Sequence, residues 1–458
     1  MTHLPQPPSL SLRSAGAFVL MVLGIAKSHA QQSSATFERW AASRAIPLVS
    51  VDPVKTTADL RQLASIIGSA RIVAFGEPAH GAHQPLAFRN RLFRYLVEEL
   101  GFTAIAIESG LPESRHVQAF IQTGVGDAQQ IAHEYLSYGF GDWRENVELI
   151  QWMRDYNANP AHRRKIRFYG FDISLGGWGS AIPRPAPFEA ALSLLSRADS
   201  ASADRLRGVL LPVLRLPDAP PSLTTDELNV ISTAVDELLS RLERNRPVLL
   251  VTTSAADYEW GHRNAVLSQQ AIRMLRAMPR GMSQDFSAGL PASIWEPLET
   301  RDVSMAHNVR WILAQEGTAG RLLVFAHNGH VMNARYRGTG IVSVFAQPPN
   351  QLGVYLRSAF GGDLVIIGTS SAANGSGLSA ATLDTTSLDA SFARVGPRRF
   401  YLDLRSSRYS RDAREWLAQP RLLRANFGAF DLNVPPTAFD VIVFIDTLTP
   451  ALAVRPTP

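Results

Sequence analysis

Short apolar runs recur along the chain, and most of them end at a charged residue or at Gly and Pro. They are rich in β-branched residues and apolar on both faces, as strands buried from two sides are. Hydrophobic positions three or four residues apart predict helices between them, over residues 85–100, 145–157 and 301–316. The predicted strands cover residues 71–76, 103–109, 165–174, 246–252, 321–327, 364–369 and 439–446. This alternation predicts an α/β fold with a largely parallel central sheet flanked by helices.

One region interrupts the alternation. Between about residues 175 and 290, Gly- and Pro-rich sequence is followed by long helical patterns. The segment from Thr224 opens with Thr-Thr-Asp-Glu before an apolar period, which is a helix start signal. We interpret this region as a helical insertion that caps the α/β core, within a single domain of residues 31–458.

The first thirty residues read as a targeting segment. They contain Arg13 and no acid, then the apolar run AGAFVLMVLGIA, then Ser-His-Ala before Gln31. This order predicts a signal peptide over residues 1–30 and a periplasmic or secreted protein. An uncleaved membrane anchor is the alternative. Elsewhere no apolar run is long enough to cross a bilayer.

Charge and cysteine content narrow the possible functions. Loss of Arg13 and Lys27 with the signal reduces the 45 basic residues to 43, against 40 acidic ones. No block of Lys and Arg is interleaved with aromatics, so nucleic acid is not an expected partner. The chain has no cysteine. A cysteine nucleophile, a cysteine-bound zinc and an iron–sulfur cluster are therefore excluded. No pattern indicates an oligomeric state.

Titratable residues stand at the ends of four predicted strands. Glu77, Glu108, Asp172 and His327 each follow an apolar run directly. In an open α/β sheet, ligands bind beyond the carboxyl ends of the strands, so these side chains are expected at one site. Three further histidines lie close by in sequence, namely His80 and His83 in the loop after Glu77, and His330 after His327.

Arg89 lies where a core residue is expected. It shares a helical stripe with Leu92, Phe93 and Leu96, so it should face the sheet. A buried cation near a helix N-terminus needs a carboxylate partner, because burial and the helix dipole both disfavour it. Glu77 and Glu108 are the predicted partners, and a purely structural ion pair is the alternative.

The usual motifs for a covalent nucleophile or a nucleotide are absent. The sequence has no G-x-S-x-G elbow, no phosphate-binding glycine loop and no H-E-x-x-H zinc helix. Histidine, carboxylate and arginine at one edge instead suit direct attack of water on a carbonyl group, with the histidine as base. Two alternatives remain. One is a metallohydrolase that holds a divalent ion through Glu77, His80, Glu108, His327 and His330. The other is a non-catalytic envelope protein that binds a ligand such as haem.

Several segments taken together resemble the erythromycin esterase family. They are GEPAHG with Arg89 after it, GFTAIAIESG, WRENVELIQWMRDYN, IRFYGFDIS, RDVSMAHNVRWIL, FAHNGHV and FDVIVFIDT. They follow one another in this order over most of the predicted mature chain. The resemblance implies an α/β core with helical additions and an active-site cleft over the sheet, in a hydrolase. We expect no cofactor, with a divalent metal ion as the alternative. Its characterised members open a macrolide lactone ring.

The resemblance also implies roles for individual residues. The family's histidine base falls on His80, its acids on Glu77 and Glu108, and its arginine on Arg89. The Ala-His-Asn-Gly-His segment adds His327 and, beside it, His330. From their positions in the sequence, His330, Asp172 and His83 are expected in supporting or substrate-binding positions, with a structural role as loop anchor or helix cap as the alternative for Asp172 and His83. On this reading Arg89 stabilises the oxyanion and His327 protonates the leaving group or positions the carbonyl. The sequence departs from the family at Pro78 and in its predicted signal peptide, so a small-molecule ester other than a macrolide is also a possible substrate.

Overall fold

The protein is described by a computed structural model that covers residues 34–173, 185–215, 223–279, 292–375, 378, 382–405, 409–425 and 429–454. The predicted signal peptide lies outside the described residues. Among the described helices, none is both long enough and apolar enough to cross a membrane.

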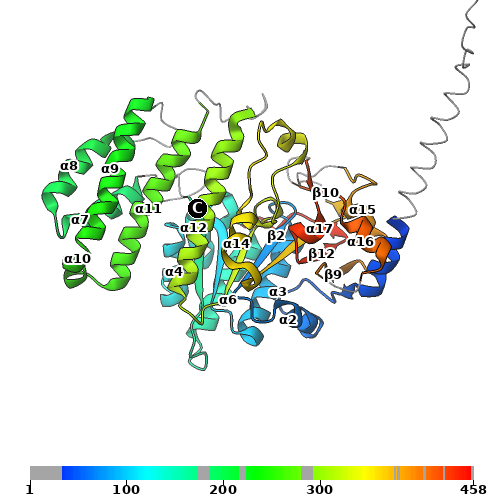
Figure 1. The fold of residues 1–458 in the computed structure, drawn as a ribbon. Helices are drawn as coiled ribbons and strands as arrows, with labels where there is room; N and C mark the ends of the chain where they lie inside the picture. The colour runs from blue at the N-terminus through cyan, green and yellow to red at the C-terminus, as the bar shows by residue number, and fades with distance from the viewer. Residues whose placement is uncertain are drawn as a thin grey trace, which may run out of the picture.

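A central sheet runs through the molecule, with helices packed on both faces (Figure 1). Its order is β1-β9-β12-β7-β2-β5-β3-β4. The six strands from β12 to β4 are parallel, and β9 and β1 extend the β12 edge with antiparallel pairing. The α/β fold with a largely parallel sheet is therefore confirmed. The strands are β1 (Ile46–Pro47), β2 (Ile72–Glu77), β3 (Ala104–Gly110), β4 (Arg167–Asp172), β5 (Leu322–His327), β7 (Leu364–Ser370), β9 (Arg399–Asp403) and β12 (Val441–Ile445).

Each face of the sheet has its own hydrophobic core because successive side chains of a strand point to opposite faces. In β2, Val73 and Phe75 join one core, and Ile72 and Ala74 join the other. The first core is covered by α2 (Arg61–Ile67), α3 (His83–Leu100), α4 (Ser114–Thr123), α5 (Ala128–Tyr135) and α6 (Arg144–Ala158). The second is covered by α12 (Trp295–Gln315), α14 (Leu352–Phe360), α15 (Leu388–Ala393), α16 (Arg411–Leu417) and α17 (Pro435–Ala438).

Five helices between β4 and α12 form a helical layer at one end of the molecule (Figure 1). They pack around a separate hydrophobic cluster that includes Leu192, Leu206 and Leu238. The helix start predicted at Thr224 is confirmed. Thr224 is the N-cap of a helix over residues 225–244, and it forms a reciprocal capping box with Glu227. The helices are α7 (Ala186–Ser196), α8 (Ser200–Leu214), α9 (Thr225–Arg244), α10 (Arg246–Thr252) and α11 (Ala255–Ala277).

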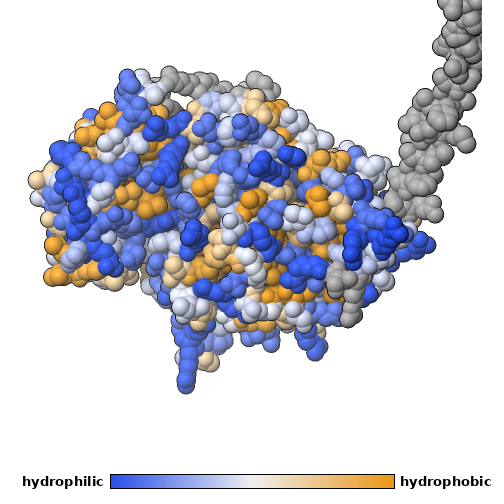
Figure 2. All heavy atoms as spheres, in the orientation of Figure 1, coloured by the Kyte–Doolittle hydropathy of each residue, from blue (hydrophilic) through white to orange (hydrophobic). Residues whose placement is uncertain are grey.

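The predicted strand over residues 246–252 is wrong, because this segment is helix α10. Pro247 stands in the first turn, where its fixed backbone angle suits a helix. Only Leu249 is buried, whereas Val248 and Val251 are 51% and 87% exposed. Figure 2 shows hydrophobic residues exposed over this end of the helical layer. The apolar run therefore does not mark a strand buried from two sides.

Smaller elements complete the fold. A three-stranded sheet has the order β10-β11-β6, and β13 pairs with β8. The short strands are β6 (Gly338–Thr339), β8 (Ala373–Asn374), β10 (Arg421–Arg424), β11 (Phe430–Asn433) and β13 (Thr447–Leu448). The short helices are η1 (Ala58–Leu60), η2 (Ser137–Asp142), η4 (Ala292–Ile294), α13 (Asn328–Val331), η5 (Gly340–Val344) and η6 (Gly361–Asp363). Of these, η2 and α13 carry residues of the site described next.

Candidate active site

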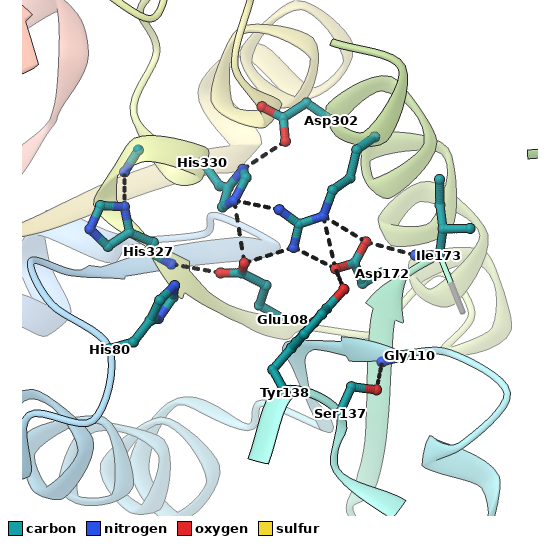
Figure 3. A network of polar contacts seen from close by, with 12 residues as sticks. His80, Glu108, Gly110, Ser137, Tyr138, Asp172, Ile173, Asp302, His327 and His330 are labelled. Atoms are coloured by element: carbon teal, nitrogen blue, oxygen red, sulfur yellow. Dashed lines mark hydrogen bonds and ion pairs between the residues drawn. The ribbon is translucent and has the colours of Figure 1, made fainter. Parts of the chain in front are cut away.

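The carboxyl ends of four neighbouring strands bring the predicted acids and histidines together. In the sheet, β2, β5, β3 and β4 lie side by side, and Glu77 is directly opposite His327 in the parallel ladder. Gly76 allows α13 to pack closely over β2, because a Cβ atom there would lie 2.4 Å from Asn328 Oδ1. The site therefore forms at the edge of the sheet that the sequence predicts (Figure 3).

Glu77 and His80 form a hydrogen-bonded pair. His80 Nδ1 lies 2.7 Å from Glu77 Oε1. The Glu77 side chain is 2% exposed and that of His80 is 28% exposed, so the pair runs from the interior towards solvent. Because Nδ1 is engaged by the carboxylate, the reactive nitrogen of His80 would be Nε2.

The surroundings of His80 favour its protonated form. Burial alone would lower its pKa, but the hydrogen bond with Glu77 and the negative charges of Glu108 and Glu77 outweigh burial, and the pKa is raised. The His327 ring lies 5.2 Å from the His80 ring, and the Phe140 ring of η2 lies 5.3 Å away on a different element. His80 is thus held between an imidazole and an aromatic side chain.

Arg301 of α12 is the cation that pairs with the acids of the site. Its Nη2 atom donates to Glu108 Oε1 at 2.8 Å and to Asp172 Oδ2 at 2.5 Å. Its Nε atom also lies within 3.1 Å of both Asp172 oxygens. Tyr138 donates its hydroxyl to Asp172 Oδ2 at 2.8 Å. Two acids from neighbouring strands thus share one guanidinium group.

His330 completes this network from α13. Its Nδ1 atom lies 2.7 Å from Asp302 Oδ1, and its Nε2 atom lies 3.3 Å from Glu108 Oε1. Burial alone would lower the pKa of His330, but Asp302 and Glu108 raise it to about 10. A protonated His330 donates from both nitrogens. Its 3.0 Å approach to Arg301 Nη1 is then a contact of two cations that share Glu108.

Glu108 remains a carboxylate at neutral pH. Burial alone would raise its pKa, but the charges of His330 and Arg301 hold its pKa well below the usual range. Its second oxygen, Oε2, accepts the backbone N–H of His327 at 3.0 Å. Glu108 therefore anchors the end of β5 and cannot serve as a proton donor.

His327 has both ring nitrogens bound to the backbone. Nδ1 accepts the Gly329 N–H at 3.0 Å as the cap of α13, and Nε2 lies 3.2 Å from the Pro78 carbonyl oxygen. Nε2 must then carry the proton, and His327 is a neutral imidazole. Burial, reinforced by the positive charge of nearby His80, lowers its pKa to about 3. It holds the loop after β2 in place.

His327 and His330 should each keep a single protonation state around neutral pH, with His327 neutral and His330 protonated. We expect histidine-labelled NMR spectra to show no titration of His327 between about pH 5 and 9, and His330 to stay protonated until the pH approaches 10. A raised folded-state pKa means that His330 stabilises the fold fully below about pH 6.5, and that this contribution is lost as pH rises towards 10. Titration of His330 near pH 6.5 would contradict the assigned network.

The predicted pairing of Arg89 with Glu77 or Glu108 is observed only in part, since the charge of Glu77 favours the charged form of Arg89 but no direct ion pair joins them among the described residues. Arg89 is fully buried and faces the sheet as expected. Its Nε and Nη2 atoms, however, donate to Asn90 Oδ1 at 3.0 and 2.7 Å, and its guanidinium carbon lies 4.7 Å from the centre of the Phe325 ring. Among the described residues it forms no ion pair within 4 Å. The helical stripe predicted the burial of Arg89, but its contacts depend on Asn90 and on Phe325 of β5, which the stripe does not reveal.

His83 lies apart from the Arg301 network. Its Nδ1 atom lies 2.5 Å from Oε1 of Glu145, an α6 residue that is 2% exposed. The Glu145 hydrogen bond is the largest cause of a raised His83 pKa. His83 and Glu145 thus form a second histidine–carboxylate pair, just three residues along the chain from His80.

Sequence reasoning missed Arg301, Asp302 and Tyr138 as residues of the site. Asp302 is on the buried stripe of α12 with Met305 and Val309, the same signal that identified Arg89. Tyr138 has a positive φ of 65°, which is unique among the described non-glycine residues. Such a strained backbone is common at functional sites and is visible only in the structure.

The metal ligands that the sequence allows are not arranged to hold an ion. Within the described ranges, no three side chains of His, Cys, Asp or Glu are placed to hold a metal. Glu108 is occupied by Arg301 and His330, and both His327 nitrogens by the backbone. The side chains of the site therefore fit a metal ion poorly.

The protein-family model for erythromycin esterase matches residues 97–448, which is most of the chain. The chain belongs to the erythromycin esterase family. It is 26% identical to erythromycin esterase type II of Escherichia coli over 350 residues, which are 73% of this chain and 77% of that protein. A shorter stretch of 89 residues, 19% of this chain and 20% of the relative, is 35% identical to the putative hydrolase YbfO of Bacillus subtilis. As a family member the protein is an esterase hydrolase.

Solved structures agree with this family fold. A Bacillus cereus protein is 25% identical with a TM-score of 0.74, and the match covers 92% of this chain and 99% of that one. A mutant erythromycin esterase in its open conformation is 17% identical with a TM-score of 0.67, over 90% of this chain and 99% of its own. At that identity the second likeness concerns the fold alone. The range matched by the family model begins after Glu77, His80 and Arg89. Their place in the candidate active site therefore depends on the geometry described above.

Proposed function

We propose that the protein hydrolyses a carboxylic ester by direct attack of water, with His80 as the general base. The observation that carries this proposal is the Glu77–His80 pair, which is 2.7 Å long, buried at Glu77 and partly exposed at His80. A carboxylate behind a histidine fixes the ring and stabilises the imidazolium ion that forms. No acyl-enzyme is needed, because water is the nucleophile.

The reaction can be written from these groups. His80 Nε2 takes a proton from water as the water oxygen bonds to the ester carbonyl carbon. Arg301 and protonated His330 stabilise negative charge on the carbonyl oxygen. The carbon–alkoxide bond then breaks, and the imidazolium of His80 returns its proton to the leaving oxygen. This replaces the roles that the family resemblance implied for Arg89 and His327, since Arg89 is buried and His327 is neutral and bound to the backbone.

Because the base must be neutral to act, activity should rise with pH through the raised pKa of His80, above its usual value of 6.5. We propose that no metal is required, that the substrate is a small-molecule ester and that the protein is exported after cleavage of residues 1–30. The family relationship favours a macrolide lactone, and the E. coli relative is called an erythromycin esterase.

Mass spectrometry tests the substrate directly. Fourteen- and sixteen-membered macrolides and a set of aryl and alkyl esters are incubated with purified enzyme, with and without a chelator. We expect a macrolide to gain the mass of one water, equally in both conditions. Hydrolysis of simple esters alone would reject the macrolide substrate and keep the esterase. Activity lost to the chelator and restored by a divalent ion would reject the metal-independent mechanism.

A further inference from the structure

Three buried polar atoms behind the Glu77–His80 pair have no hydrogen-bond partner among the described residues. They are Glu77 Oε2, Arg89 Nη1 and Glu145 Oε2. Two are carboxylate oxygens and one is a cationic donor, so their charges are complementary. Each buried polar atom that lacks a hydrogen-bond partner lowers the free energy of unfolding by about 1–3 kcal/mol. Buried polar atoms of this kind commonly bind an internal water.

Hydrogen bonds connect the same residues. Arg89 donates to Asn90 Oδ1 at 2.7 Å through Nη2, and Asn90 Nδ2 donates to the backbone oxygen of Glu145 at 2.7 Å. The electrostatic partners of Arg89 are Glu77 and Glu145, which both favour its charged form against burial. The charges of two glutamates thus act on Arg89, and each of these glutamates binds a histidine Nδ1 atom, at 2.7 Å for His80 and 2.5 Å for His83.

We propose that Glu145 and His83 form a second histidine–carboxylate pair of this active site, which shares the charge of Arg89 with Glu77 and thereby positions the Glu77–His80 pair for catalysis. The proposal builds on the function proposed above for His80. Glu145 and His83 are positioning residues, because they act through Arg89 and do not touch the reacting atoms. It also gives a purpose to the second histidine of the sequence GEPAHGAH.

The opposite charges of Glu145 and His83 predict opposite effects on the pKa of His80. When the negative charge of Glu145 is removed, only Glu77 offsets the positive charge of Arg89. The surroundings of His80 then become more positive, so the pKa of His80 should fall. Removing His83 takes away the cation that offsets Glu145 wherever His83 is protonated, so the pKa of His80 should rise. Across a buried, low-dielectric path each shift should be on the order of half a pH unit. A purely packing role for the pair would not give shifts of opposite sign.

Other charged groups face these residues and must be separated from the effect. His80 also faces Glu108, His327 and His330. His83 also faces Glu148 of α6 and Asp52. Glu148 offers a matched control, because it is on the same helix as Glu145 and carries the same charge, but its side chain is exposed to water. Its charge should therefore be screened from His80.

The experiment compares Glu145→Gln, His83→Asn and Glu148→Gln with the unchanged protein. The pKa of His80 is measured by NMR on histidine-labelled protein, with His80→Ala to assign the resonance, and the acidic limb of kcat/KM is measured alongside. We expect a downward shift in Glu145→Gln, an upward shift in His83→Asn, and a change below about 0.2 pH unit in Glu148→Gln.

The outcomes separate the two proposals. Unchanged His80 titration in both Glu145→Gln and His83→Asn would overturn the second pair, whatever the activity. If Glu145→Gln fails to fold, His83→Asn alone decides, because His83 is partly exposed. If the NMR shifts appear but His80→Ala remains active, the pair exists and the proposed catalytic role of His80 is wrong.

Discussion

The variant His80→Ala is expected to lose ester hydrolysis while keeping its fold. Loss of a general base lowers kcat/KM by about 10²–10⁴-fold, because no positioned group then accepts a proton from the attacking water. The protein should still unfold cooperatively from a native state but with a modest loss of stability, because the partly exposed His80 ring is small, whereas the buried Glu77 carboxyl loses its hydrogen bond, at a cost of about 1–3 kcal/mol. Steady-state kinetics and thermal unfolding of the same preparation measure both effects.

His262→Ala is the matched control for this experiment. The His262 side chain is 25% exposed, against 28% for His80, and it also faces a glutamate, with Nε2 3.5 Å from Glu243 Oε1. It is in the helical layer, far in sequence from the catalytic edge, so its loss should leave kcat/KM unchanged. Near-normal hydrolysis by His80→Ala would reject the proposed mechanism. A similar fall in both variants would point to a general loss of active protein.

Arg301→Met should be the most destabilising single change at the site. It leaves the carboxylates of Glu108 and Asp172 buried without their cation, at 5% and 1% side-chain exposure. Removing one partner of a buried ion pair costs about 3–5 kcal/mol of unfolding free energy. Urea unfolding at neutral pH measures this loss, and hydrolysis should fall as well, because the oxyanion loses a stabilising charge.

Two further variants identify the cause. Arg357→Met removes an arginine that pairs with one acid, Asp440, whose side chain is 13% exposed, so it should cost less than Arg301→Met, which strands two acids of lower exposure. Adding Asp172→Asn to Arg301→Met removes one of the stranded charges and should restore part of the lost stability. Equal losses in Arg301→Met and Arg357→Met, with no recovery in the double variant, would show that the two acids do not depend on Arg301.

Much of the site could be predicted because hydrophobic runs fix where strands end. The runs before Glu77, Glu108 and His327 are buried strands, and parallel pairing brings their ends to one edge. The run over residues 246–252 has the same composition but is α10. Periodicity alone does not distinguish a short apolar strand from a short helix, and only the position of Pro247 favours the helix.

Partners were harder to predict than positions. The burial of Arg89 follows from its helical stripe, whereas its neighbours depend on how β5 and α6 approach α3. Arg301 is 193 residues from Glu108 in sequence, so no local pattern connects them. Asp172 was expected as a loop anchor or supporting acid. It is both, since it binds Arg301 and also accepts the N–H of Ile173.

The short strands with antiparallel pairing show a different limit. β9 contains Arg399 and Asp403 at its ends and is not a continuous apolar run, so hydrophobicity does not reveal it. It lies one strand in from the border of the sheet, between β12 and the two-residue edge strand β1, and pairs with both in antiparallel fashion. The short strands β6 and β11 have too few residues for a pattern to be read.

The placement of Glu77 opposite His327 has a consequence for how the protein folds. This pair closes a loop of roughly half the chain, and closing long loops is slow because their entropy must be lost before contacts form. The helices α7 to α11 instead pack mainly on one another within one stretch of the chain, residues 186–277. The helical layer can therefore form early, whereas the catalytic groups meet only when distant strands pair, so partly folded chains would be rich in helix and inactive.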